Sequence, residues 1–290
     1  MAVRAGGRHV RAYPILISGQ LPGVRPSARR CGRKETELAA KLLLQEAEML
    51  SELQHSDRIV RLFGVSIGRG KVHLVLELAS GSLSQFLHGP RGSRDKVLDS
   101  RQRMSLALQV MEGVAFLHSC RPCVLHGDLK SSNVLLFQVP DDDLLVAKLA
   151  DFTTAHRWRG ARPSPEEDPA YFGGSVAYLA PECFEAVENQ SPSSDVWSVG
   201  CVLTELFGGA APFSECETEE EVKDKVLRRR QTPWVPSHVD LAAGLNYKES
   251  GQSIHTLLAR CFARSPNDRP TALAALQDLQ LLARSQLCAA

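Results

Sequence analysis

The chain has 290 residues, of which 43% are hydrophobic and 23% are charged. This composition is typical of a globular protein with a sizeable core and excludes wholesale disorder. The 34 Lys and Arg residues nearly balance the 33 Asp and Glu residues, so a formal net charge of +1 gives no field that would attract nucleic acid or an anionic membrane. Apolar stretches end well before the roughly 20 residues of a membrane-spanning helix, and no export signal is visible. We therefore expect a cytoplasmic protein without a membrane span.

The eight cysteines are spread along the whole chain. Disulfide frameworks belong to small secreted domains, whereas a chain of this length can build its core without them. Only Cys120 and Cys123 are closely spaced, and a single C-x-x-C pair supplies half of a zinc site. We expect reduced thiols and a reducing compartment.

Within the first third of the chain, the spacing of apolar residues changes from irregular to periodic. Residues 1–34 are rich in Gly, Pro and Arg and show no sustained period, which predicts an irregular segment. Residues 35–53 place apolar side chains three or four positions apart, which predicts an amphipathic helix. Two strands are predicted at residues 59–67 and 72–78, joined by a glycine-containing turn, and a short helix at residues 82–87.

The remainder of the chain is mostly helical in its pattern. Residues 101–118 are largely apolar, which predicts a helix central to the core. Short strands are predicted at 134–137 and 145–149 around an aspartate-rich turn at 140–143, and residues 154–175 predict a long polar loop. Further helices are predicted at 195–207, 253–262 and 271–283. Strands followed by a helical body indicate the α+β class.

The residues best suited to chemistry form the sequence H-G-D-L-K-S-S-N, which begins at His126. Asp128 can orient a hydroxyl group and accept its proton, Asn133 can ligate a metal ion, and Lys130 can neutralise charge on a transferring phosphoryl group. Asp151 follows the strand at 145–149 and suits Mg²⁺, because hard cations prefer carboxylate oxygens.

These motifs resemble those of the eukaryotic protein kinase family, in which H-R-D-L-x-x-x-N is followed by D-F-G. The resemblance continues in Ala180-Pro181-Glu182, in the segment 195–200 and in Arg269, which in this family pairs with the A-P-E glutamate. It covers roughly residues 35–282. Small-molecule phosphotransferases also carry H-G-D, but they lack the A-P-E segment and the D-x-W-S-x-G helix. These two elements therefore favour the protein kinases.

The resemblance implies a two-lobed fold, with residues 1–34 as an irregular segment or a remnant of N-lobe strands, 35–79 as a partial N-lobe and 80–285 as the C-lobe. It implies transfer of the ATP γ-phosphoryl group to Ser or Thr of protein substrates, with ATP and Mg²⁺ as cofactors. The implied catalytic residues are Asp128, Lys130 and Asn133. The implied nucleotide-binding residues are Glu46, Glu77, Ala79, Leu135 and Asp151, with Asn133 and Asp151 as metal ligands.

Other features concern structure and subclass. The resemblance implies that His126 stacks beneath Phe152 and that Asp195 holds the backbone of the catalytic loop. Lys130, two residues after Asp128, is typical of Ser/Thr kinases, as is the G-S-V-A-Y sequence that contains Ser175 in the place of a threonine. The sequence L-K-S-S-N-V-L-L resembles the tyrosine-kinase-like branch, whose members mostly phosphorylate Ser and Thr.

The chain departs from the family pattern in several places. Gly127 replaces an arginine that commonly binds an activation-loop phosphate, so we expect no switching by that route. Thr153 replaces the D-F-G glycine, and a β-branched residue disfavours the positive φ that glycine tolerates. No G-x-G-x-x-G precedes Glu46, and the ATP-anchoring lysine is either replaced by Arg29 or Arg30 or absent. An alternative therefore stays open, a pseudokinase that acts as a binding or allosteric module without turnover.

Overall fold

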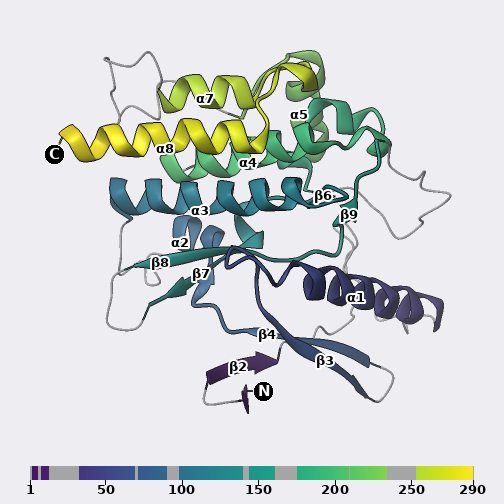
Figure 1. The fold of residues 1–290 in the computed structure, drawn as a ribbon. Coiled ribbons are helices and arrows are strands. Elements are labelled where there is room, and N and C mark those ends of the chain that lie inside the picture. Colours follow the sequence, from purple (N-terminus) through teal and green to yellow (C-terminus); the bar gives the residue numbers. More distant parts are fainter. Residues whose placement is uncertain are drawn as a thin grey trace.

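The computed structural model describes residues 2–5, 8–12, 33–68, 71–89, 98–139, 144–160, 175–208, 210–233 and 253–289. The expectations for Arg29, Arg30, the turn at 140–143 and most of the loop at 154–175 lie outside these residues. The described residues form a smaller body built on a sheet and a larger helical body, which lie at opposite ends of the molecule in Figure 1.

The smaller body is built on an antiparallel sheet with the strand order β1-β2-β4-β3. Its strands are β1 (Ala2–Ala5), β2 (Arg8–Ala12), β3 (Leu62–Gly68) and β4 (Lys71–Glu77). The hairpin of β3 and β4 confirms the two strands that the sequence predicted. The sequence of residues 1–34 shows no strand period, yet its described part contributes β1 and β2, and β2 pairs with β4.

Helix α1 (Arg33–Leu53) contacts both β3 and β4 and confirms the helix predicted at residues 35–53. Its buried apolar residues recur every three or four positions: Leu43, Ala47, Leu50 and Leu53. One stripe of the helix therefore faces the protein interior. Glu46 lies on this stripe and is only 4% exposed.

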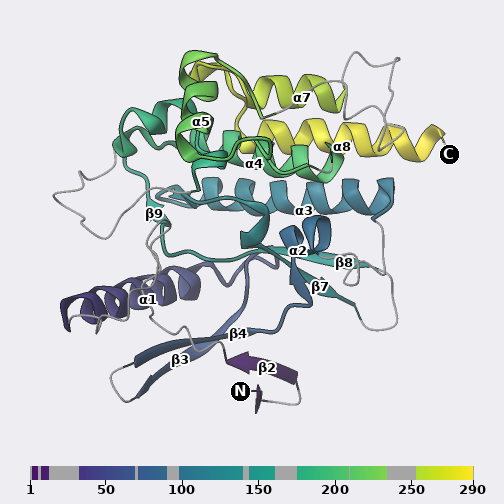
Figure 2. The same cartoon turned by 180° about the vertical axis from the view of Figure 1, so that it is seen from behind.

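The larger body is centred on α3 (Ser100–Ser119), which contacts α4 (Pro192–Gly208) and α8 (Ala272–Ala289). Figures 1 and 2 show these three helices stacked side by side, with α3 facing the smaller body. Helix α3 begins at a capping box formed by Asp99 and Gln102. The remaining α-helices of the described residues are α2 (Leu83–His88), α5 (Glu219–Lys223) and α7 (Ile254–Cys261).

Short strands lie between the two bodies (Figure 1). They form two small antiparallel sheets, one of β5 (Gly81–Ser82), β7 (Val134–Gln138) and β8 (Leu145–Leu149), the other of β6 (Val124–Leu125) and β9 (His156–Arg157). Residues 126–133 connect β6 to β7, and residues 150–155 connect β8 to β9. Because both loops are anchored by strand pairing at each end, the predicted site residues on them lie at the boundary of the two bodies.

The strand predicted at residues 59–67 begins three residues later, at Leu62. Ile59 instead forms a parallel bridge with Leu149. The N–H of Val60 donates to the Leu149 carbonyl at 2.9 Å, and the N–H of Leu149 donates to the Arg58 carbonyl at 2.8 Å. The predicted start was wrong because an apolar run does not show which strand it pairs with, and this segment joins the smaller body to β8.

The predicted α+β, two-lobed class is confirmed, with the sheet and α1 forming the small lobe and the helices the large lobe. The helices predicted in the second half of the chain are confirmed, with ends that differ by one to three residues except at the end of α8, which extends six residues beyond its predicted end. Within the described residues, no helix combines the length and the hydrophobicity needed to span a membrane.

Candidate active site

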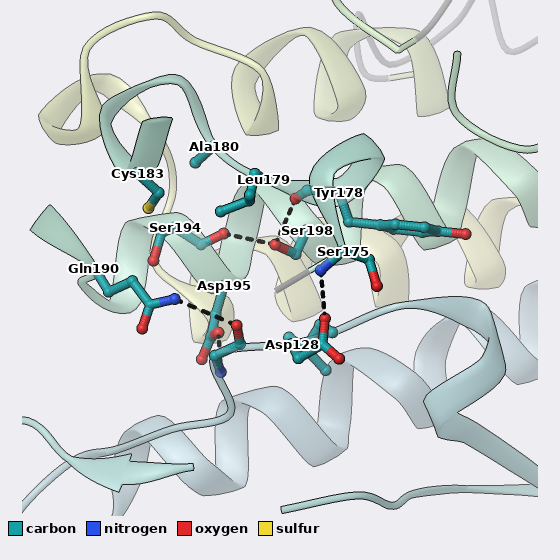
Figure 3. A pocket seen from close by; sticks show the side chains of 12 residues that line it. Asp128, Ser175, Tyr178, Leu179, Ala180, Cys183, Gln190, Ser194, Asp195 and Ser198 are labelled. Atoms are coloured by element: carbon teal, nitrogen blue, oxygen red, sulfur yellow. Dashed lines mark hydrogen bonds between the residues drawn. The ribbon is translucent and has the colours of Figure 1, made fainter. Parts of the chain in front are cut away.

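Asp128 lies in the loop between β6 and β7, where its carboxylate accepts two short hydrogen bonds and a third, longer one from Asn133. Ser175 N–H donates to Oδ1 at 2.8 Å and Lys130 Nζ donates to Oδ2 at 2.6 Å. Lys130 Nζ also donates to Ser175 Oγ at 2.9 Å. Figure 3 shows the Asp128 carboxylate pointing at the backbone of Ser175. The three residues thus form a closed polar cluster in which an ammonium group compensates the carboxylate charge.

Asn133 ends a 3-10 turn that begins at Ser131, and it is 7% exposed. Its Nδ2 donates to the Asp128 carbonyl at 2.9 Å and lies 3.4 Å from Asp128 Oδ2. Because the amide nitrogen is directed at Asp128, the Oδ1 atom of Asn133 points elsewhere and can ligate a cation. The Asn133 carbonyl accepts a hydrogen bond from Ala150 N–H at 2.9 Å, which ties this loop to the segment that carries Asp151.

Asp195, on α4, holds the backbone of the catalytic loop. Its carboxylate accepts hydrogen bonds from the N–H groups of His126 at 3.0 Å and Gly127 at 3.1 Å, and His118 Nε2 lies 3.0 Å from Oδ2. Burial by itself would raise the pKa of Asp195, but the hydrogen bond and charge of His118, together with His126, keep the pKa below its usual value. The predicted structural role of Asp195 is confirmed.

Gly127, which replaces the family's arginine, has a φ of 79°, in the left-handed region that favours glycine. A Cβ at this position would come within 3.1 Å of the Thr154 carbonyl oxygen. A larger residue here would require the neighbouring backbone to move.

Asp151, Phe152 and Thr153 form a turn directly after β8. The positive φ in this turn belongs to Asp151, at 63°, and Thr153 is not among the residues with positive φ. Thr153 therefore replaces the D-F-G glycine without adopting a left-handed backbone, because the left-handed residue of the turn lies two positions earlier. The Thr153 hydroxyl donates to Asp151 Oδ1 at 2.6 Å, a distance typical of a charge-assisted hydrogen bond.

Phe152 anchors this turn and is 1% exposed. Its ring centroid lies 4.9 Å from that of His126, which confirms the predicted contact, but the two rings are tilted by 46° and are not stacked in parallel. Its N–H donates to Glu46 Oε1 at 3.0 Å. The turn is therefore held by the small lobe through α1 and by the large lobe through the catalytic loop.

The side chain of Glu46 reaches the Asp151 turn from α1. Its carboxyl group accepts a hydrogen bond from the backbone N–H of Phe152. Burial, and then the nearby Asp151 carboxylate, raise the pKa of Glu46 to about 7, although the hydrogen bond from Phe152 N–H acts in the opposite direction. Ionised Glu46 is thus disfavoured in the folded chain.

This raised pKa predicts a pH-dependent stability that Glu46→Gln removes. Between pH 4.5 and about 7, Glu46 is ionised in the unfolded chain but stays protonated in the folded chain. The contribution of Glu46 to the free energy of unfolding is therefore complete below pH 4.5 and is lost as the pH rises through about 7. The pKa difference corresponds to about 3 kcal/mol. In urea unfolding without divalent cations, we expect Glu46→Gln to be more stable than wild type at pH 8 by up to that amount and nearly equal to it at pH 4.5. A difference that is the same at both pH values contradicts this, and Glu48→Gln, on the exposed side of α1, is the matched control.

The predicted nucleotide-binding residues other than Glu46 and Asp151 lie near the connection between the lobes. The Glu77 carboxylate accepts hydrogen bonds from Lys148 Nζ at 2.7 and 3.0 Å and from Arg61 N–H at 2.8 Å, so a contact of Glu77 with a nucleotide would have to come from its backbone. Ala79 follows β4 and is half-buried. Leu135, on β7, pairs with Ser82 of β5 and is also half-buried. Their role in binding stays a prediction.

Two residues that form hydrogen bonds at the site, Ser175 and Glu205, were not among the predicted site residues. Ser175 lies 47 residues from Asp128, and nothing in its neighbourhood of the sequence indicates the contact. Glu205, on α4, has no exposed surface and accepts hydrogen bonds from Tyr178 at 2.8 Å, Ser131 at 2.8 Å and His88 at 2.7 Å. Burial and the Glu205 charge raise the pKa of Tyr178. Glu205 thereby joins the catalytic loop to the segment that carries Ser175.

The pairing of Arg269 with Glu182 is confirmed as a bidentate ion pair. Nη1 and Nη2 of Arg269 each lie 2.7 Å from a carboxylate oxygen of Glu182. The Arg269 side chain has no exposed surface. This pair fixes the segment at 180–182 against the end of the large lobe.

The donor set fits a magnesium ion shared with a bound nucleotide. Asn133 Oδ1 and the Asp151 carboxylate supply hard oxygen atoms, and Mg²⁺ is usually held by one or two carboxylates together with substrate phosphates and water. Within the described residues, no group of three or more His, Cys, Asp or Glu side chains forms a self-contained metal cage. The residues present therefore suit a metal that binds with ATP better than a structural metal.

Comparison with known proteins gives the family. The family model of the protein kinase domain matches residues 27–280. The LRR receptor-like serine/threonine-protein kinase ERECTA of Arabidopsis thaliana is 32% identical over 230 residues, which cover 78% of this chain and 22% of that protein. Mitogen-activated protein kinase kinase kinase 10 of Homo sapiens is 28% identical over 282 residues, 96% of this chain and 27% of that protein. Serine/threonine-protein kinase SSK22 of Saccharomyces cerevisiae is 30% identical over 253 residues, 82% of this chain and 17% of that protein.

The chain thus spans between 17% and 27% of the length of these three relatives. The match of the family model extends over both lobes and includes the catalytic loop, the Asp151 turn and the Glu182–Arg269 pair. The chain belongs to the protein kinase domain family.

Proposed function

We propose that this chain is a serine/threonine-protein kinase that transfers the γ-phosphoryl group of ATP to protein substrates. The observation that carries the proposal is the cluster of Asp128, Lys130 and Ser175, with Asn133 and Asp151 beside it. A chain selected only for binding has no need to keep these groups together at the boundary of the lobes. The printed names of the relatives support the Ser/Thr class.

Each residue of the cluster has a role that its contacts support. Asp128 orients the substrate hydroxyl and accepts its proton, since a carboxylate with three bound donors still has a lone pair for a fourth. Lys130 supplies positive charge beside the transferring group. Asn133 and Asp151 would hold Mg²⁺, which would neutralise negative charge on the phosphates of a bound nucleotide.

The site favours positioning over covalent chemistry. Phosphoryl transfer by kinases depends mainly on alignment and electrostatic stabilisation. Asp195 fixes the loop backbone, and Ser175 N–H fixes one oxygen of Asp128. These supports are buried or half-buried, so the catalytic groups are held before a substrate arrives.

We also propose a reducing, cytoplasmic setting. The cysteines of the described residues are all free thiols: Cys120, Cys123, Cys183, Cys201, Cys216 and Cys261. Burial raises the pKa of Cys183 and of Cys261 to about 12, which makes these thiols unreactive.

The test is phosphate transfer from ATP labelled in its γ-phosphate to a generic protein substrate. We expect labelled phosphoserine and phosphothreonine in the presence of Mg²⁺ and none in the presence of EDTA. A chain carrying Asp128→Asn gives the background. Transfer no greater than this background overturns the proposal and leaves a pseudokinase that acts as a binding module.

A further inference from the structure

The hydroxyl of Thr153 is directed at a carboxylate that the proposed function assigns to Mg²⁺. Thr153 Oγ1 donates to Asp151 Oδ1 at 2.6 Å, and Thr153 N–H lies 3.5 Å from the same oxygen. Both donors of Thr153 therefore converge on one oxygen atom. The other carboxylate oxygen, Oδ2, receives neither of them.

Asp151 needs such a restraint because its backbone is in an unfavourable conformation. Its φ of 63° is unfavourable for an ordinary residue, and aspartate tolerates it when its short side chain bonds locally. A glycine at position 153 would leave only the long N–H contact. The hydroxyl adds a short, charge-assisted hydrogen bond, a type that is stronger than a bond between neutral groups.

The residues on either side of Thr153 are fixed by other partners. Phe152 is held by Glu46 and by the ring of His126, and the Thr154 hydroxyl donates to the His126 carbonyl at 2.9 Å. The two neighbouring threonines therefore have different partners. Only the Thr153 hydroxyl acts on the carboxylate itself.

We infer that Thr153 is a positioning residue for the metal ligand Asp151: its hydroxyl holds Oδ1 in the turn and leaves Oδ2 to face a divalent cation. The inference rests on the proposed function, because it takes Asp151 as a ligand of Mg²⁺. Loss of a hydrogen-bond partner of a metal ligand typically lowers metal affinity 10–100-fold. The departure from D-F-G thus adds a restraint to the metal site.

The test measures Mn²⁺ binding to the full chain with a non-hydrolysable ATP analogue, from the electron paramagnetic resonance signal of free Mn²⁺. Thr153→Val keeps the β-branched shape but removes the hydroxyl, so we expect the Mn²⁺ dissociation constant to rise about 10–100-fold. Thr153→Ser keeps the hydroxyl and is expected to bind Mn²⁺ as the wild type does. Thr154→Val, the matched control, removes the neighbouring hydroxyl and is expected to leave Mn²⁺ affinity unchanged.

The outcomes separate this inference from the proposed function. If Thr153→Val binds Mn²⁺ like the wild type while Asp151→Asn abolishes binding, the inference is overturned and the function stands. Equal losses in Thr153→Val and Thr154→Val would show a general loss of order in the turn and would also overturn it. A wild-type chain that binds no Mn²⁺, or an Asp151→Asn chain that binds it normally, overturns both. Affinity for the analogue in EDTA is expected to be equal in wild type and Thr153→Val, since the hydroxyl acts only through the metal ligand.

Discussion

Replacing Asp128 by asparagine is expected to lower the rate of phosphoryl transfer about 10²–10⁴-fold, the usual contribution of a positioned general base. The amide cannot accept the proton of a substrate hydroxyl. Its NH₂ group would also face a donor, either Ser175 N–H or Lys130 Nζ, because both carboxylate oxygens accept a hydrogen bond in the wild type. The substitution therefore removes the proposed base and disturbs the Lys130 ammonium group, which is proposed to stabilise the transferring group.

The measurement is the initial rate of transfer under saturating ATP, beside the thermal unfolding midpoint of each chain. Asp99→Asn is the matched control, since it makes the same chemical change at the exposed N-cap of α3, where asparagine caps a helix as well as aspartate does. We expect the control to keep the wild-type rate. A chain with Asp128→Asn that folds and retains more than about a tenth of the rate contradicts the assigned role, because a general base contributes more than this.

The catalytic loop could be located from the sequence because its residues are close together along the chain. Asp128, Lys130 and Asn133 lie within six positions, and the loop between β6 and β7 brings them into hydrogen-bond contact. The ring contact between His126 and Phe152 and the pair formed by Arg269 and Glu182 were reached in another way, through the resemblance to a family.

The contacts that the sequence did not reveal are those between distant segments with no local pattern. Ser175 completes the site through its backbone N–H, and a backbone group leaves no trace in residue type. Glu205 is a fully buried carboxylate within an apolar helix, and its three donors come from α2, the catalytic loop and the segment after residue 174. An acidic residue in such a helix indicates a buried polar contact, but the identity of its partners depends on tertiary structure.

Thr153 shows a different limit of sequence reasoning. The motif indicates which position usually holds glycine, but it does not show which residue of the turn adopts positive φ. In this chain the left-handed residue is Asp151, and the threonine bonds to its side chain. Similarly, the strands β1 and β2 have no alternating pattern of their own, and their place in the sheet follows from pairing with β4. In both cases tertiary context determined a conformation that local preference left open.

Replacing Arg269 by methionine is expected to lower the free energy of unfolding by about 3–5 kcal/mol, the usual cost of removing one partner of a buried ion pair. The Arg269 guanidinium binds both carboxylate oxygens of Glu182 and donates to the carbonyls of Ser193 and Ala263 at 2.9 Å. It also lies 5.1 Å from the ring centroid of Trp197. Methionine fills much of the volume but leaves the Glu182 carboxylate, only 13% exposed, and two carbonyls without their donors.

A second arginine serves as a control, because it separates the cost of breaking a buried ion pair from the cost of replacing an arginine that forms an exposed one. Arg260 pairs with Asp278 at 2.5 Å, but its side chain is 46% exposed, so Arg260→Met is expected to cost at most about 1 kcal/mol in urea unfolding. If the larger cost at Arg269 arises from a stranded carboxylate, adding Glu182→Gln to Arg269→Met should recover part of the stability, because no unpaired charge then remains. If it arises instead from packing on Trp197, the double variant should be no more stable than Arg269→Met. Equal costs for the two arginine variants would show that burial adds nothing to the Glu182–Arg269 pair.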